Sequence, residues 1–167
     1  KVKMPLALLY AMHDPKYNWK YYSEPEPHLN NRRLFCPRGK MIGGCSAHNG
    51  MVFVRGNRND YERWENFGLK SWSYQKILPY FKKIENWSGG ENQYRGSFGP
   101  LPINQSKNDN PLFKAFLNAA SEAGHVNNPD MNGEYQEGFG MFDTTIHNGE
   151  RASATKYYLN PAKSRKN

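Results

Sequence analysis

The segment at residues 38–51 constrains this chain more than any other, because glycines, small residues and one histidine are concentrated there. Gly43 and Gly44 leave the backbone without Cβ atoms, so it can adopt unusual φ/ψ angles and closely approach a flat ring or a phosphate. If a helix opens within residues 44–51, its free N–H groups favour an anionic or electron-accepting group beside the glycines. A tight glycine turn before an ordinary helix is the alternative interpretation of Gly-Gly alone. The segment as a whole predicts a cofactor site.

Residues 38–62, RGKMIGGCSAHNGMVFVRGNRNDYE, resemble the first signature of the glucose-methanol-choline (GMC) oxidoreductases, flavoenzymes that oxidise alcohols with FAD. The matching positions are Gly39-Lys40, Gly43-Gly44, Ser46, Asn49, Phe53, Gly56 and Glu62. Cys45 stands where serine is commoner in the family, and His48 stands where an aliphatic residue is usual. Both departures are similar to the choline oxidases, in which a histidine of this segment is bonded covalently to the flavin. The alternatives for His48 are a hydrogen-bonded pocket histidine or a ring turned away from a non-covalent flavin.

Further segments in family order extend the resemblance over nearly the whole chain and narrow it to the choline dehydrogenases. They are Met4-Pro5, Tyr17-Asn18-Trp19, Glu24-Pro25-Glu26-Pro27, Asn30-Asn31-Arg32-Arg33, Trp72-Ser73-Tyr74, Leu78-Pro79-Tyr80-Phe81, Gly99-Pro100-Leu101, Asn110-Pro111-Leu112, Gln136-Glu137-Gly138-Phe139-Gly140, Gly149-Glu150-Arg151-Ala152-Ser153 and Tyr158-Leu159-Asn160-Pro161-Ala162. The resemblance implies an FAD-dependent enzyme that oxidises choline to betaine aldehyde by hydride transfer to the flavin, a step toward glycine betaine. Another GMC dehydrogenase or oxidase of primary alcohols, and a basic interaction module without catalysis, stay open as alternatives.

The resemblance also implies which residues bind the cofactor. Arg38, Gly39 and Lys40 are expected near the FAD phosphate and ribose. The residues expected to line the isoalloxazine are Gly44, Cys45, Asn49, Gly50, Met51 and Val52, with His48 as the residue for a covalent bond. No catalytic residue and no metal ligand is predicted within the chain, and the electron acceptor is left open.

The chain lacks a G-x-G-x-x-G motif after a hydrophobic strand, although a dinucleotide-binding fold needs such a turn for the FAD pyrophosphate. In the family this turn comes earlier, and the catalytic histidine and its partner come later. We therefore expect an internal fragment, inactive by itself, of a two-domain α/β flavoprotein. Its fold class is α+β, with short helices and strands and long loops. Residues 1–105 are expected to be part of the FAD-binding domain, including the flavin-contacting loop and helix, and residues 106–167 the start of the substrate-binding domain.

Composition supports a chain that wraps around a larger core. With glycine counted and tyrosine left out, the apolar fraction is about 39%, below the usual 45–50% or so. Eleven prolines and fifteen glycines predict many turns. The net charge of +8 is dispersed, without a basic stripe, which argues against nucleic-acid binding and leaves peripheral association with anionic lipid open.

Two cysteines without metal-ligand spacing argue against a disulfide framework and favour a reducing compartment. The expected location is cytoplasmic or membrane-associated, and mitochondrial if the source is eukaryotic.

Local patterns predict the secondary structure. Helices are expected over residues 4–12, over 59–66 with Asn59 as N-cap, over 73–84 with a bend at Pro79, from Pro111 to Gly124, and over 153–159. Strands are expected over 21–24, 34–35, 101–103 and 139–146, the last followed by an Asn148-Gly149 turn.

Overall fold

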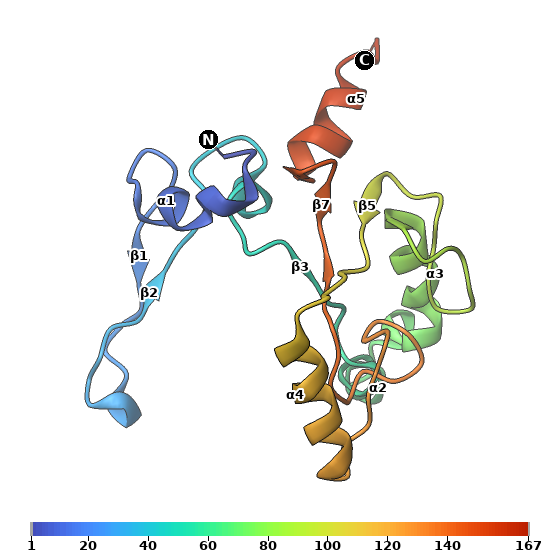
Figure 1. Ribbon diagram of the computed structural model, residues 1–167. Helices are drawn as coiled ribbons and strands as arrows, with labels where there is room; N and C mark the ends of the chain where they lie inside the picture. The colour runs from blue at the N-terminus through green and yellow to red at the C-terminus, as the bar shows by residue number, and fades with distance from the viewer. Residues whose placement is uncertain (1, 167) are drawn as a thin grey trace. The chain divides into compact units, whose positions relative to one another are not determined.

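The computed structural model describes residues 2–166 and shows short helices and strands joined by long loops (Figure 1). The packing divides the chain into two compact units, one of Lys1–Met51 with Ile146–Asn167 and one of Val52–Thr145. Within residues 2–166 the strands form four separate two-stranded sheets. The predicted mixture of short elements is thus confirmed. The assignment of residues 1–105 and 106–167 to cofactor and substrate domains stays a prediction.

The first unit begins with a 3₁₀ turn, η1 (Pro5–Ala7), and the helix α1 (Leu8–His13), which together cover the helix predicted over 4–12. The strand β1 (Tyr21–Tyr22) pairs antiparallel with β2 (Phe35–Cys36), and the turn η2 (Pro27–Leu29) lies between them (Figure 1). The 3₁₀ helix η3 (Gly44–Ala47) follows.

After the second unit, the chain returns to the first unit through a hairpin. The strands β7 (Ile146–His147) and β8 (Glu150–Arg151) pair antiparallel. Asn148 and Gly149 both have positive φ, 51° and 73°, as a type I′ hairpin turn requires. The predicted Asn148-Gly149 turn is confirmed. A π-helical turn, η5 (Thr155–Leu159), and the short helix α5 (Asn160–Ala162) follow, where a helix over 153–159 was expected.

The second unit combines three helices with two strand pairs. Its helices are α2 (Arg58–Asn66), α3 (Tyr74–Ile84) and α4 (Pro111–Glu122), and a 3₁₀ turn, η4 (Lys70–Trp72), precedes α3. Its strands are β3 (Val52–Phe53) antiparallel to β6 (Asp143–Thr144), and β4 (Glu85–Trp87) parallel to β5 (Leu101–Ile103). The predicted strand over 101–103 and the predicted helices over 73–84 and from Pro111 are confirmed.

Two local predictions in this unit are wrong. Asn57, and not Asn59, caps α2, because its backbone is extended and its side chain accepts a hydrogen bond from the Asn59 N–H. The single strand expected over 139–146 is broken into separate pieces, because Phe139 bridges to Asn127 while β6 and β7 pair with different partners.

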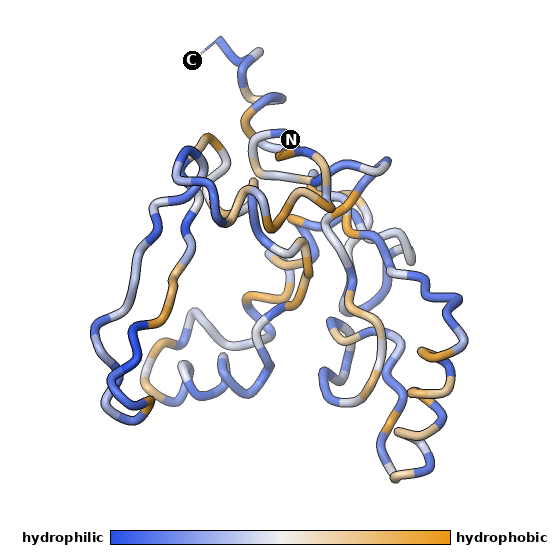
Figure 2. Tube along the Cα trace, turned by 60° about the vertical axis from the view of Figure 1, so that its left-hand side comes forward, coloured by the Kyte–Doolittle hydropathy of each residue, from blue (hydrophilic) through white to orange (hydrophobic). Residues whose placement is uncertain are grey.

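The apolar core is small. Ile103 is fully buried, and Ile77, Trp87 and Ala120 are nearly so. Figure 2 shows hydrophobic residues in short stretches separated by hydrophilic ones along the trace, in keeping with the low apolar content. Among residues 2–166, no helix has the length and apolar character needed to cross a membrane.

Candidate cofactor site

The glycine-rich signature forms a tight turn with a short helix inside it. Gly43 has a φ of 94° and leads into η3, which ends at Ala47. Met51 also has a positive φ, 60°, and its N–H donates to the Asn49 Oδ1 atom at 3.1 Å. Such side-chain bonds to the backbone compete with helix formation. The helix that was expected within residues 44–51 is therefore a single four-residue turn, too short to offer an N-terminal anion site. The candidate site depends on the glycine backbone itself.

The glycines of the signature have two different roles. A Cβ atom on Gly39 would lie 2.2 Å from the Gly44 carbonyl oxygen, and one on Gly43 would lie 2.5 Å from Thr155 Oγ1. These two glycines allow close packing within the turn. By contrast, a Cβ on Gly44 or Gly50 would meet nothing within 4 Å. The backbone at Gly44 and Gly50 is therefore bare and faces open space, which fits a flat ring lying against it.

The predicted cofactor residues differ in how accessible they are. Six are exposed, namely Arg38, Lys40, Cys45, Asn49, Gly50 and Val52, and Gly39 and Gly44 are half-buried. Two are buried, because His48 is only 3% and Met51 only 6% exposed. The structure places nine of the ten in the first unit, whereas Val52 begins the second.

The two cations of the signature are held at the surface. The Lys40 Nζ atom lies 4.8 Å from the centroid of the Trp19 ring, a cation–π distance. The Arg38 side chain donates to the Pro37 carbonyl at 2.8 Å. Both side chains therefore remain available to an anionic group such as a phosphate.

His48 has an unusual environment for a polar side chain. Both ring nitrogens are buried, and neither has a hydrogen-bond partner among the described residues. Leaving a buried polar atom unpaired costs about 1–3 kcal/mol, so a partner for this ring is expected in the complete protein.

The segment 151–155 is hydrogen-bonded to the signature turn. The sequence did not indicate these contacts. Arg151 is 3% exposed and donates to the carbonyl oxygens of Ser46 and Asn49. The Ala154 N–H donates to Ser46 Oγ at 2.9 Å. Burial lowers the pKa of the Arg151 guanidinium, which nevertheless stays charged at neutral pH. From the family resemblance, residues 151–153 were expected to return toward the flavin and to have an architectural role, but no contact of Arg151 with the signature was predicted.

A model of the GMC oxidoreductase family matches residues 9–167, nearly the whole chain. The chain belongs to the GMC oxidoreductase family. This confirms the family resemblance that the signature indicated.

Relatives within the GMC family include the oxygen-dependent choline dehydrogenases of Rhizobium etli and Brucella anthropi, each 51% identical over 166 residues. The match covers 99% of the chain but 30% of each relative, so the chain spans about a third of the length of these curated relatives. Among solved structures, pyridoxine 4-oxidase from Mesorbium loti aligns with a TM-score of 0.90 at 28% identity, over 99% of this chain and 33% of that one. Formate oxidase from Aspergillus oryzae shares the fold, with a TM-score of 0.81 at 23% identity over 95% of this chain and 29% of that one.

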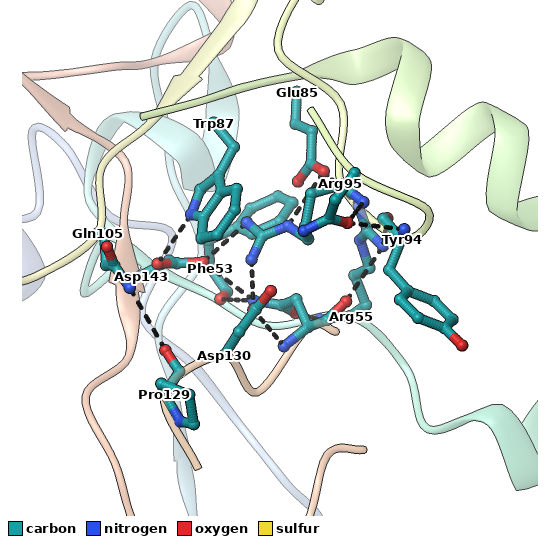
Figure 3. Close-up of polar contacts among 12 residues, drawn as sticks. Phe53, Arg55, Glu85, Trp87, Tyr94, Arg95, Gln105, Pro129, Asp130 and Asp143 are labelled. Carbon is teal, nitrogen blue, oxygen red and sulfur yellow. Dashed lines mark hydrogen bonds and ion pairs between the residues drawn. The ribbon is translucent and has the colours of Figure 1, made fainter. Parts of the chain in front are cut away.

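A second polar centre of this GMC chain is a buried charge network in the second unit (Figure 3). Arg95 is fully buried and forms ion pairs with Glu85, Asp130 and Asp143, and Arg55 also pairs with Glu85. The Arg95 guanidinium lies 4.2 Å from the Trp87 ring centroid. Burial lowers the pKa of Arg95, but the hydrogen bonds to Glu85 and Asp143 outweigh it and raise the pKa overall.

This network joins segments that are far apart in the sequence. The Arg95 partners lie 10, 35 and 48 residues away. No local pattern could therefore have indicated it. Most of its donors and acceptors are used within the second unit, although Arg55 Nε and Glu85 Oε2 are buried without a partner among the described residues, and we assign the network to the packing of this unit.

Proposed function

We propose that this chain is the flavin-holding part of an FAD-dependent oxidoreductase that acts on CH–OH donors, with choline as the substrate and betaine aldehyde as the product. The observation that carries the proposal is the bare backbone at Gly44 and Gly50, within the signature of a family of flavoenzymes. Relatives named choline dehydrogenases at 51% identity support the choice of substrate.

The residues of the chain would hold the cofactor in two parts. The exposed cations Arg38 and Lys40, with Gly39 between them, suit the phosphate and ribose. Gly44, Cys45, Asn49, Gly50 and Val52 suit the isoalloxazine, and Met51, whose side chain is buried, would contribute main-chain atoms. When bound, FAD supplies the hydride acceptor, while the chain orients it and shields one face from water.

The test is a substrate panel on the full-length protein, with choline compared with its neutral isostere 3,3-dimethyl-1-butanol and with simple primary alcohols. A cation–π contact between a quaternary ammonium group and a desolvated aromatic ring is worth about 2 kcal/mol or more. An enzyme that recognises choline by its charge is therefore expected to have a kcat/KM for choline roughly 30-fold above that for the isostere. Oxygen and artificial acceptors are compared in the same assays.

Equal rates on choline and its isostere would favour another primary-alcohol enzyme of the family. A full-length protein without flavin that is retained on nucleic acid or anionic vesicles in a salt-sensitive manner would favour a basic interaction module instead.

The finer proposal concerns how the cofactor is attached, and it names His48 as the site of a covalent bond. Its ring nitrogens have no partner among the described residues, so a bond from one of them to the benzenoid methyl carbon of the flavin would satisfy an atom that is otherwise orphaned. Forming this C–N bond would break one C–H bond of the methyl group and the N–H bond of the imidazole. Two protons would be released, and the two electrons would reduce the flavin, which the external electron acceptor of the enzyme would then reoxidise. Since the ring is buried, it has to turn outward when the bond forms. Such a bond would make the flavin more electron-poor and favour hydride acceptance.

Acid precipitation of the full-length protein tests this attachment. We expect a yellow pellet from the wild type and a colourless pellet from His48→Ala, since only a covalent flavin survives denaturation. His28→Ala, at an exposed histidine of η2 outside the candidate site, serves as the control and should keep the yellow pellet. A colourless wild-type pellet with FAD in the supernatant would show that the cofactor is held non-covalently.

A further inference from the structure

Arg151 makes an unusual set of contacts for a buried cation. Its guanidinium donates to the Asn49 carbonyl oxygen at 2.7 Å and to the Asn49 Oδ1 atom at 2.8 Å. Longer bonds reach the carbonyl oxygens of Ser46 at 3.4 Å and Val2 at 3.3 Å. Arg151 thus holds both the main chain and the side chain of one signature residue.

The charge of Arg151 has no anionic partner in the described part of the chain. No carboxylate forms an ion pair with it there, in contrast to Arg95 in the second unit, which has three. A buried cation is expensive unless it is compensated. The compensation that the structure shows for this charge comes from carbonyl and amide oxygens, mainly the two oxygens of Asn49 in the signature turn.

The contacts determine how the Asn49 carboxamide is oriented. Its Oδ1 atom accepts from both Arg151 and the Met51 N–H, and therefore has to face inward. The Nδ2 group is then on the opposite side of the amide, and the structure gives it no partner within residues 2–166. Asn49 is exposed and the backbone of the neighbouring Gly50 is bare, so a ligand that lies against Gly50 can reach this donor.

We propose that Arg151 is a positioning residue of the cofactor site, which acts by fixing the Asn49 carboxamide so that its Nδ2 group donates to the isoalloxazine. The inference rests on the proposed function, because it takes the flavin as the acceptor. A well-placed donor, supported by a nearby positive charge, stabilises the more electron-rich reduced form of the flavin. Loss of this arrangement should therefore make the bound flavin harder to reduce.

A double-mutant cycle on the full-length holoenzyme tests the proposal. The four proteins are the wild type, Arg151→Lys, Asn49→Ala and the double variant, and the readouts are flavin content and the equilibrium constant for two-electron reduction, measured against a dye of known potential. Arg151→Lys keeps the charge, but its shorter side chain cannot bring the ammonium nitrogen to the position of the Arg151 Nη1 atom, which donates both bonds to Asn49. Arg63→Lys, at an exposed arginine that pairs with Asp60, is the matched control.

Each single variant is expected to lower the reduction constant about tenfold, the factor for one hydrogen bond. When Arg151→Lys is added to Asn49→Ala, the reduction constant should then change by less than about twofold, because the effects of substitutions at residues that act as a unit are not additive. The control should match the wild type.

Additive effects of the two substitutions would overturn the proposal, since Arg151 would then act independently of Asn49. Loss of flavin from Arg151→Lys but not from Asn49→Ala would also overturn it, because Arg151 would then maintain only the turn. Equal loss of flavin from Arg151→Lys and Asn49→Ala, with no further loss from the double variant, would support the proposal. A wild type without flavin would instead contradict the proposed function itself, before the cycle begins.

Discussion

Replacing Arg95 with methionine is expected to destabilise the second unit by about 3–5 kcal/mol, the range for breaking a buried ion pair by removing one partner. The side chain is fully buried, and its loss leaves Glu85, Asp143 and Asp130 without their shared cation. Methionine is apolar and cannot satisfy these oxygens. The free energy of unfolding, from denaturant titration of the full-length protein followed by tryptophan fluorescence, measures the effect, and Trp87 lies against Arg95 as a local reporter.

The matched control is Arg63→Met, at an arginine on α2 that pairs with Asp60 at the surface. Exposed pairs contribute at most about 1 kcal/mol, so this substitution should change the free energy of unfolding only slightly. If Arg95→Met and Arg63→Met had equally small effects, the charge network would not hold the second unit together.

Replacing Gly50 with valine is expected to weaken FAD binding by roughly 10–100-fold, because overpacking a filled site costs about 1–3 kcal/mol. The position has open space beside it and its φ lies outside the left-handed region, so a Cβ atom there meets nothing within 4 Å in the described chain. Only a ligand lying against the backbone would collide with it. The measurements are the flavin-to-protein ratio of the purified full-length variant and the thermal stability of its flavin-free form.

Gly39→Val is the informative contrast, because a Cβ at Gly39 would collide with the Gly44 carbonyl oxygen in the turn itself. This variant should lose thermal stability as well as flavin. Full flavin content in Gly50→Val would mean that no ring lies on that face of the turn.

Local sequence signals account for the parts of the fold that were predicted correctly. Pro111 opens α4 at its first position, with Asn110 as the cap, and Asn148-Gly149 forms the β7–β8 turn through two positive φ angles. A secondary-structure prediction failed where the segment pairs with residues from elsewhere in the sequence. The strand over 139–146 is interrupted because Phe139 bridges to Asn127, and no pattern within the segment itself records that contact.

The same distinction applies to the candidate site. Glycines and a histidine adjacent in sequence indicated the signature turn, whose family is confirmed. The clamp on that turn comes from Arg151, which is 102 residues from Asn49 along the chain. A single arginine in a polar segment carries no sign of its partner, so its contacts became visible only in three dimensions.

The most direct measurement is a crystal structure of the full-length protein with its cofactor. We expect the isoalloxazine to lie in van der Waals contact, about 3.5–4 Å, with the Cα atoms of Gly44 and Gly50. Side chains from the rest of the protein filling that space, with no room for a ring, would contradict the assignment of these residues to a flavin site.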